Sequence, residues 1–172
     1  TNPQNRYTCA LDAYKPFNAL YSQSIQVAQH VGGQIRLFQK GLHVKKGEAY
    51  NGHLYLRGKL KGKVTVSLVA AGIEPLARQE LGSIDSKTWK QYSFTLTPNE
   101  TSADAAFFID IAGAGTISID QAILMPAITY NGHGTRPDMM ETYKALKPPV
   151  VRWPGGSYLM WHDWKRAIGP QD

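Results

Sequence analysis

Short stretches of alternating apolar and polar residues run along the chain from about residue 24 to residue 123. In one of them Leu54 and Leu56 alternate with polar or aromatic neighbours, and in another Val64, Val66 and Leu68 do the same. A period of two places one face of each strand in a core. The pattern therefore predicts an all-β sandwich of the jelly-roll type. Its eight strands are expected over residues 24–31, 34–40, 50–57, 63–70, 76–84, 89–96, 105–111 and 116–123.

Glycine-rich phrases separate these expected strands. Gly32-Gly33, Lys61-Gly62 and the segment 113–115 consist largely of residues that tolerate turn dihedrals. We therefore expect the chain to reverse direction at each of them.

The apolar period changes in the segment 135–148. Met140, Tyr143 and Leu146 recur at every third position, Pro137 stands where the first turn of a helix accepts proline, and a second proline closes the segment. This pattern predicts a single helix after the sandwich.

A short apolar run follows the expected helix and carries one charge. Val150, Val151 and Trp153 are typical of a buried parallel strand, and Arg152 lies among them. A buried arginine needs a carboxylate partner. Glycines directly after the run allow a sharp turn at the strand end that carries ligand sites in α/β folds. The pattern favours the mouth of a catalytic site.

The phrase RWPGG at residues 152–156, with Asp163-Trp164 and Ile168-Gly169-Pro170 further along, resembles the RxPGG…W…IGP signature of family 51 glycoside hydrolases. These are mostly α-L-arabinofuranosidases, with some endoglucanases. The stretches 120–126 and 132–138 are similar to the junction at which that family passes from a β-sandwich into its (β/α)8 barrel.

Residues of about 20 to 126 resemble carbohydrate-binding modules of the family four and nine type. The phrases that carry this second resemblance are Gln39-Lys40-Gly41-Leu42, Lys46-Gly47-Glu48-Ala49-Tyr50, Trp89-Lys90-Gln91-Tyr92 and Ile117-Ser118-Ile119-Asp120. Together the resemblances imply a carbohydrate-binding-like sandwich over residues 1–126. Residues 127–172 would then hold a linker and the first helix and strand of the barrel. A whole barrel of about 250 residues does not fit in 172 residues, so the remainder of the barrel is an expected partner.

The resemblance also implies roles for residues near the expected barrel strand. The two catalytic carboxylates of the family lie on later strands and no carboxylate here matches them, so the isolated chain is not expected to hydrolyse glycosides. Arg152 would support those carboxylates, or pair with one for stability only. Ser157, Trp161 and Trp164 are expected to contact substrate, with packing of the tryptophans against barrel loops as the alternative. Ser157 stands where the better-known arabinofuranosidases have asparagine, which leaves specificity for arabinofuranosides open.

The sandwich has its own candidate surface on one expected strand. His53, Tyr55 and Arg57 would present an aromatic ring beside hydrogen-bonding groups to a polysaccharide or oligosaccharide, and Gln39 and Tyr50 are expected to join them. The alternative is an ordinary exposed sheet face with a cross-strand tyrosine.

Two further residues of the sandwich have a structural and a functional interpretation. Trp89 is expected to be a half-buried core anchor rather than a stacking platform. The resemblance to carbohydrate-binding modules would place Asp120 near a structural calcium ion, but this aspartate is expected instead to be solvated or to cap a turn, so no cofactor is expected. Adjacent His162 and Asp163 lack a third ligand at metal-binding spacing, so no metal site is expected.

Charge and cysteine content narrow the class of partner. The net charge of +6 would suit nucleic acid, but the lysines are spread over hairpins and no run of five like charges occurs, so no nucleic-acid partner is expected. The single cysteine, Cys9, excludes a disulfide within the chain, and no apolar run is long enough to suggest a membrane partner. The resemblance implies a secreted or periplasmic parent.

The expected function is an accessory carbohydrate-binding module joined to the start of a retaining glycoside hydrolase that acts on plant cell-wall polysaccharide. Hydrolysis of arabinofuranosides is the reaction expected of the parent, with hydrolysis of β-glucans as the alternative. The alternatives are a glycan-binding module without catalytic descent, and a sandwich that serves only as a structural spacer or interaction domain.

Overall fold

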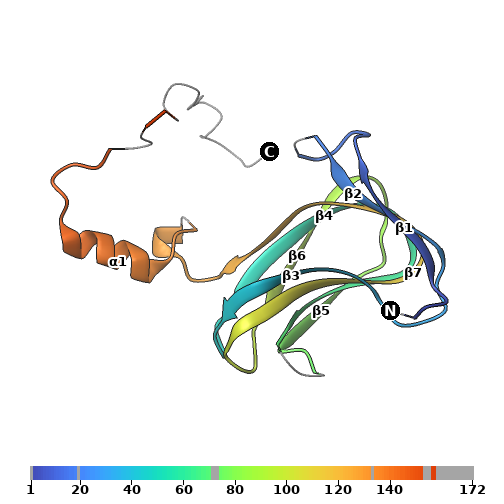
Figure 1. The fold of residues 1–172 in the computed structure, drawn as a ribbon, viewed down its shortest axis with the longest axis horizontal. Helices are drawn as coiled ribbons and strands as arrows, with labels where there is room; N and C mark the ends of the chain where they lie inside the picture. Colours follow the sequence, from blue (N-terminus) through green and yellow to red (C-terminus); the bar gives the residue numbers. More distant parts are fainter. Residues whose placement is uncertain (1, 19, 71–73, 133, 153–155, 158–172) are drawn as a thin grey trace. The chain divides into compact units, whose positions relative to one another are not determined.

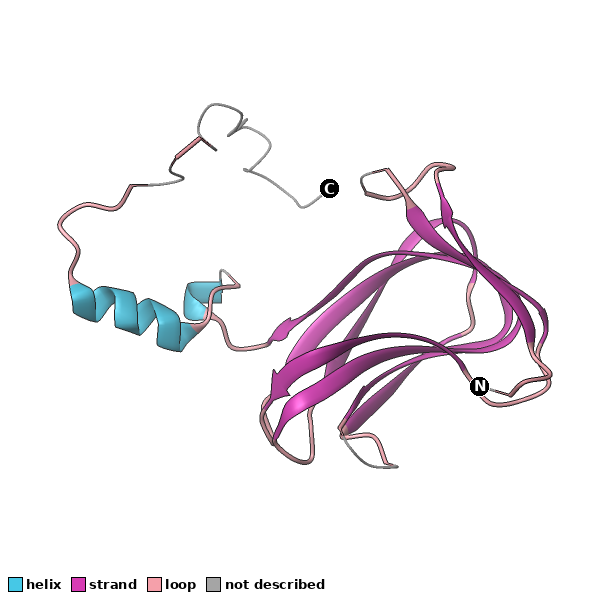
Figure 2. Ribbon diagram, viewed as in Figure 1, coloured by secondary structure: helices cyan, strands magenta, loops and turns pink. Residues whose placement is uncertain are grey.

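The computed structural model describes residues 2–18, 20–70, 74–132, 134–152 and 156–157. The chain divides into two compact units, Thr1–Ala127 and Ile128–Asp172, drawn in Figures 1 and 2. In the described residues the first unit consists of strands β1 (Arg6–Asp12), β2 (Ser22–Gln29), β3 (Ile35–Val44), β4 (Tyr50–Val69), β5 (Ala77–Gly82), β6 (Asp85–Leu96) and β7 (Ser102–Pro126). The second unit holds the 3-10 helix η1 (Tyr130–Gly132) and the helix α1 (Pro137–Leu146).

Strands β4 and β7 run through both layers of a sandwich. They pair antiparallel along their length, from Tyr50 opposite Pro126 to Val69 opposite Ala106. The first half of β4 also pairs with β6, and the second half of β7 pairs with β2, which pairs with β1. The other halves pair with β5 and β3. The first sheet is therefore β1-β2-β7-β4-β6 and the second is β3-β7-β4-β5 (Figure 1), which confirms the expected β-sandwich.

Glycines let the β4–β7 pair pass from one layer to the other. A β-carbon on Gly62 would lie 1.9 Å from the carbonyl oxygen of Ala112, and one on Gly115 would lie 2.1 Å from that of Lys59. Gly58 and Gly113 face the partner backbone in the same way. Any side chain at these positions would force the strands apart, so the bend depends on residues without a β-carbon.

The core lies between the two sheets and keeps the alternation that the sequence shows. Buried positions follow even numbers along β4 and odd numbers along the first part of β7, and the glycines of the bend occupy the same inner positions. The fully or almost fully buried residues of these two strands include Leu54, Leu56, Leu60, Val64, Val66, Leu68, Ile109, Ile111, Ile117 and Ile119. Ile25, Ile35, Phe94 and Leu96 of other strands belong to the same cluster.

Seven strands form in the described residues rather than the eight expected, partly because two pairs of expected strands are continuous. The expected strands 50–57 and 63–70 are both within β4, and β7 likewise joins two expected strands. Lys61-Gly62 and residues 113–115 lie opposite each other inside these strands, so the expectation of turns there is wrong. Glycine in the sequence marks a close approach of two backbones here, not a reversal of the chain.

Strand β1 is absent from the sequence-based expectation. Its residues are exposed or half-buried, including Tyr7 and Leu11, and it pairs only with β2 at the edge of the first sheet. Backbone hydrogen bonds rather than burial hold it, so its pattern of side chains predicts it poorly.

The second unit contains the expected helix. Helix α1 begins at Pro137 and ends before Lys147, which has a left-handed backbone conformation and precedes proline. At its start, the guanidinium of Arg136 hydrogen-bonds to Asp138 and lowers the pKa of that carboxyl. No helix in the described residues is long and apolar enough to cross a membrane.

The strand expected after this helix does not form in its described part. Residues 149–152 have no strand conformation, and Val150 and Val151 are 80% and 71% exposed. A parallel strand is stable only when neighbouring strands supply hydrogen bonds and cover its faces, and no strand of the second unit's described residues pairs with it. The expectation of a buried strand here is therefore wrong for this chain by itself.

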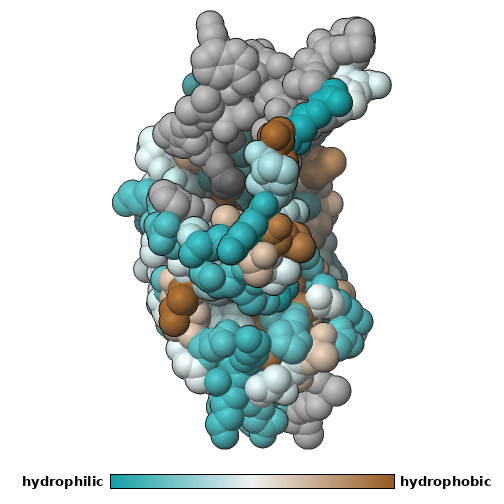
Figure 3. Space-filling view, turned by 90° about the vertical axis from the view of Figure 1, so that its left-hand side faces the viewer, coloured by the Kyte–Doolittle hydropathy of each residue, from teal (hydrophilic) through white to brown (hydrophobic). Residues whose placement is uncertain are grey.

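The face of the molecule shown in Figure 3 is mainly hydrophilic, with apolar side chains scattered among polar ones. The coloured part of this view contains no broad apolar patch.

Because the backbones of β4 and β7 approach closely at the bend, adding one methyl group there should strongly lower the stability of the fold. Gly62→Ala should lower the free energy of unfolding by about 3 kcal/mol, because the new β-carbon meets backbone that cannot move aside. Gly82→Ala is the matched control, since Gly82 has a φ of +82° but open space around it, and its cost should stay near 1–2 kcal/mol. Chemical denaturation measures both, and equal losses would contradict the steric account.

Candidate functional site

The outer face of the first sheet carries a continuous set of polar and aromatic side chains. Residues opposite each other in antiparallel strands share a face, and His53 lies between Ser93 of β6 and Ile123 of β7. In the next row Asn51 lies between Thr95 and Met125. These rows come from the same three strands whose opposite sides fill the core.

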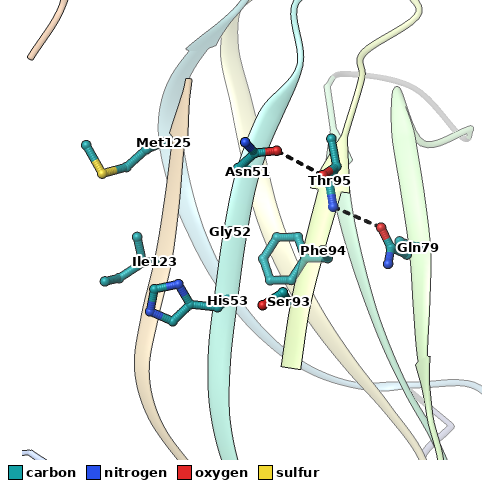
Figure 4. A pocket seen from close by; sticks show the side chains of 9 residues that line it. All are labelled: Asn51, Gly52, His53, Gln79, Ser93, Phe94, Thr95, Ile123 and Met125. Atoms are coloured by element: carbon teal, nitrogen blue, oxygen red, sulfur yellow. Dashed lines mark hydrogen bonds between the residues drawn. The ribbon is translucent and has the colours of Figure 1, made fainter. Parts of the chain in front are cut away.

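A hollow of about 530 Å³ lies over these rows, and we call it the His53 hollow. Figure 4 shows Ile123 and Met125 on one side, with Asn51, Thr95 and Gln79 on the other. Its lining residues are Asn51, Gly52, His53, Gln79, Ser93, Phe94, Thr95, Ile123 and Met125. The hollow thus has one apolar wall and one wall of amides and hydroxyls, with an imidazole between them.

Hydrogen bonds hold the polar wall in place. The hydroxyl of Thr95 donates to Asn51 Oδ1 at 2.9 Å, and the backbone N–H of Thr95 donates to Gln79 Oε1 at the same distance (Figure 4). Among the residues that the structure describes, the side-chain N–H groups of Asn51 and Gln79 have no hydrogen-bond partner, so both amides can act as donors.

A β-bulge in β7 creates the apolar wall. His53 pairs with Ile123, whereas Tyr55 pairs with Asp120, so two residues of β7 lie opposite Leu54. Gln121 in this bulge has a φ of +42°. The extra residue reverses the alternation. Before the bulge the odd-numbered residues of β7 point into the core, and after it the odd-numbered Ile123 and Met125 reach the outer face.

A loop segment crosses the same face beside the hollow. We call residues 14–18 the strap. The ring of Phe17 stacks on Tyr55 with centroids 3.6 Å apart and an angle of 15° between the planes, and it meets Trp89 edge-on at 6.4 Å. The backbone N–H groups of Phe17 and Asn18 donate to Asp120 Oδ2 at 2.9 and 3.3 Å. The strap is thereby fastened to β4, β6 and β7.

Cationic and indole groups fasten the other end of the strap. Arg57 donates to the carbonyl oxygens of Lys15 and Tyr14 at 3.1 and 3.0 Å, and its guanidinium lies 4.6 Å from the centre of the Trp89 ring. The indole N–H of Trp89 donates to the same Lys15 carbonyl at 3.0 Å. Cation–π contact and shared acceptors make this a cooperative network.

The structure thus separates the residues that the sequence groups together. His53, Tyr55 and Arg57 do share a face, but only His53 lines the His53 hollow, while the other two hold the strap. Gln39 lies on β3 in the second sheet, and Tyr50 is buried in the core, so the expectation that they join this face is wrong.

Trp89 and Asp120 have structural tasks on this face. Trp89 is half-buried, but it anchors the strap and not the sandwich core. Asp120 accepts three backbone N–H groups, including that of Gln121 at 2.8 Å, which is the turn-capping role. No cluster of three or more potential metal ligands occurs in the described part of the chain.

The other residues that line the His53 hollow are not among the site residues predicted from the sequence. Asn51 could be predicted from the sequence, because it lies two residues before His53 and therefore on the same face of the strand. Ser93 and Thr95 can be assigned to the hollow only when the register of β6 against β4 is known. Ile123 can be assigned to it only when the bulge in β7 is known. No sequence pattern indicates either feature.

The candidate residues of the second unit lie apart from any described partner. Arg152 is exposed, and within the described residues no ion pair involves it, so it is not the buried arginine expected. Ser157 is exposed in a turn. Trp161 and Trp164 lie outside the described residues.

Comparison of the sequence with curated proteins finds α-L-arabinofuranosidases, although no family model matches the chain. α-L-Arabinofuranosidase 1 of Arabidopsis thaliana is 30% identical over 76% of this chain and 20% of its own length. α-L-Arabinofuranosidase 2 of the same plant is 32% identical over 69% of this chain and 18% of its own length. The chain is related to α-L-arabinofuranosidases. An extracellular exo-α-L-arabinofuranosidase of Streptomyces chartreusis, 28% identical over 77% of this chain and 18% of its own, agrees.

These arabinofuranosidase relatives confirm the resemblance that the sequence motifs indicate. This chain spans about a fifth of the length of the curated relatives it matches. The relationship therefore concerns one part of those enzymes.

Solved structures agree on the fold. A CBM4 structure superposes with a TM-score of 0.56 at 15% identity, over 71% of this chain and 77% of its own. A putative sugar-binding protein from Bacteroides thetaiotaomicron gives a TM-score of 0.55 at 11% identity, over 71% and 83%. The arabinofuranosidase-related chain thus has the β-sandwich fold of carbohydrate-binding modules, as expected.

Because Asp120 anchors the strap, removing its carboxylate should destabilise the strap locally. Asp120→Ala should leave the backbone N–H groups of Phe17 and Asn18 without their acceptor, at a cost of roughly 1–3 kcal/mol. Hydrogen exchange at these two amides should become faster, while the exposed Asp104→Ala serves as control. Unchanged protection in Asp120→Ala would show that the rings alone hold the strap.

Proposed function

We propose that this chain includes an accessory glycan-binding module of an arabinofuranosidase-type glycoside hydrolase, and that the His53 hollow contacts the sugar. The observation that carries the proposal is the composition of this hollow, with an apolar wall facing a wall of hydrogen-bonding groups on a carbohydrate-binding-module fold. The arabinofuranosidase relatives make a polysaccharide of the plant cell wall the ligand to test first.

The chemistry of the hollow suits a neutral sugar. One face of a sugar ring presents C–H bonds, which pack on apolar side chains such as Ile123 and Met125, and its hydroxyls need donors and acceptors such as the amide of Asn51. His53 and Ser93 stand between the two walls. In this proposal Tyr55 and Arg57 act through the strap that they hold at the side of the hollow.

We propose further that the parent polypeptide is a secreted or periplasmic enzyme that hydrolyses arabinofuranosides with retention, and that residues 127–172 belong with the remainder of its catalytic barrel. The sequence relationship supports this parent activity. Arg152 would gain its carboxylate partners there, and Ser157, Trp161 and Trp164 would face substrate in the completed site. Arg152 is exposed in this chain, as expected of a charged side chain whose carboxylate partners lie on other strands of the barrel.

Binding measurements test the module's function. Isothermal titration with oligosaccharides from arabinan, arabinoxylan and cellulose should give heat with at least one of them, and His53→Ala should weaken that binding by about three- to tenfold through loss of a hydrogen-bonding group. His43→Ala makes the same substitution at an exposed position of β3 and should leave binding unchanged. Flat titrations with every sugar would favour a structural spacer instead.

Kinetics of the full-length enzyme test the role of Arg152. Arg152→Ala should lower kcat on an aryl arabinofuranoside by at least about tenfold, because a preorganised electrostatic contact to the catalytic carboxylates is lost. The exposed Arg78→Ala of β5 is a control for loss of an arginine elsewhere. Unchanged turnover in Arg152→Ala would count against the assignment.

A further inference from the structure

The outer face of the first sheet has a second hollow on the other side of the strap. Its volume is about 800 Å³, and we call it the lysine hollow. Its lining residues are Tyr14, Val27, Ala28, Arg57, Gly58, Lys59, Lys61, Asp85, Ser86, Lys87, Ala114, Gly115, Thr116 and Ser118. It shares no lining residue with the His53 hollow, so it can be altered separately.

Strand register explains the shape of this hollow. Arg57, Lys59 and Lys61 occupy alternate positions of β4 and therefore one face, opposite Ser118, Thr116 and Ala114 of β7 respectively. Long cationic side chains thus stand in a row beside short ones. The row spans about 13 Å along the strand, and the short side chains of β7 form the floor of a trough next to it.

The lysine hollow has an excess of positive charge. It contains four cations and one carboxylate. Arg57 is occupied by the strap, and Lys59 pairs with Asp85 at 2.9 Å. Within the described residues Lys61 and Lys87 make no ion pair or hydrogen bond through their side chains. Two ammonium groups are therefore available to an anionic ligand.

The other lining groups match a sugar better than a simple anion. Tyr14 is 67% exposed at this hollow, with the Arg57 guanidinium 5.8 Å from the centre of its ring. An exposed aromatic ring can pack on the C–H face of a sugar. Ser86, Thr116 and Ser118 add hydroxyls as donors and acceptors. An aromatic ring, hydroxyls and two free ammonium groups together select for a ligand that has both hydroxyls and carboxylates.

We propose that the lysine hollow is a second glycan site that binds acidic oligosaccharides through their uronate carboxylates. Lys61 and Lys87 pair with the carboxylates, and Tyr14 packs on a sugar ring. The strap separates this site from the His53 hollow, so one face of the module offers a charged and an uncharged subsite. The phosphodiester backbone of a nucleic acid fits less well, because within the described residues only two ammonium groups of this hollow are free to pair with its evenly spaced charges.

Titration with trigalacturonate at low salt tests this site, with its fully methyl-esterified form as the probe that has the same rings but no charge. The acid should bind at least about tenfold more tightly than the ester, and added NaCl should weaken the binding of the acid. The double variant Lys61→Ala and Lys87→Ala should bind trigalacturonate about tenfold more weakly, because two exposed charge pairs are lost. Lys40→Ala combined with Lys46→Ala removes the same charge from other exposed positions and should have little effect.

Three outcomes would overturn the proposal: no binding of trigalacturonate, equal binding of acid and ester, or tighter binding of a single-stranded oligonucleotide that depends on the same lysines. The His53→Ala variant keeps this test separate from the proposed function, because it should bind trigalacturonate like the wild type. A failure of neutral-glycan binding alone would contradict the proposal for the His53 hollow and not that for the lysine hollow. A failure of uronate binding alone would contradict only the proposal for the lysine hollow.

Discussion

The contact between the backbones of β4 and β7 is the constraint on which the rest of this sandwich depends. At Gly62 and Gly115 the two strands approach too closely for a β-carbon, and this lets one hydrogen-bonded ladder continue from the first sheet into the second. Because the ladder is continuous, the alternation of inner and outer side chains is carried around the bend. The side chains that fill the core and the side chains that face outward are therefore set by a single register.

Much of this fold is predictable from the sequence, because period-two alternation reports burial directly. The alternation of Leu54 with Leu56 and of Val64 with Val66 predicts a sandwich, and the structure has one. The connections are predicted less well. Glycine serves both in turns and where backbones approach closely, and the sequence around Gly62 does not distinguish the two. A strand without a buried face, such as β1, leaves no apolar pattern to detect.

The candidate site is predictable only in part. Alternation places His53, Tyr55 and Arg57 on one face, and the structure agrees. The structure assigns His53 to the His53 hollow, whereas Tyr55 and Arg57 anchor the strap. This division depends on the strap, whose Phe17 lies far away in the sequence and reaches Tyr55 only in the folded chain. Contacts of this kind follow from tertiary packing, which overrides what neighbouring residues indicate. The expected buried setting of Arg152 depends on neighbouring strands that the described residues of the second unit do not supply.

The bulge beside Gln121 has an evolutionary consequence. In a pleated strand the direction of every later side chain depends on how many residues come before it. If the same residues paired without the bulge, Leu124 would turn outward and Ile123 inward while every amino acid of the strand stayed the same. Substitutions that favour or disfavour the left-handed conformation at residue 121 are thus a short route to new ligand preferences, and they need no change in the residues that recognise the ligand.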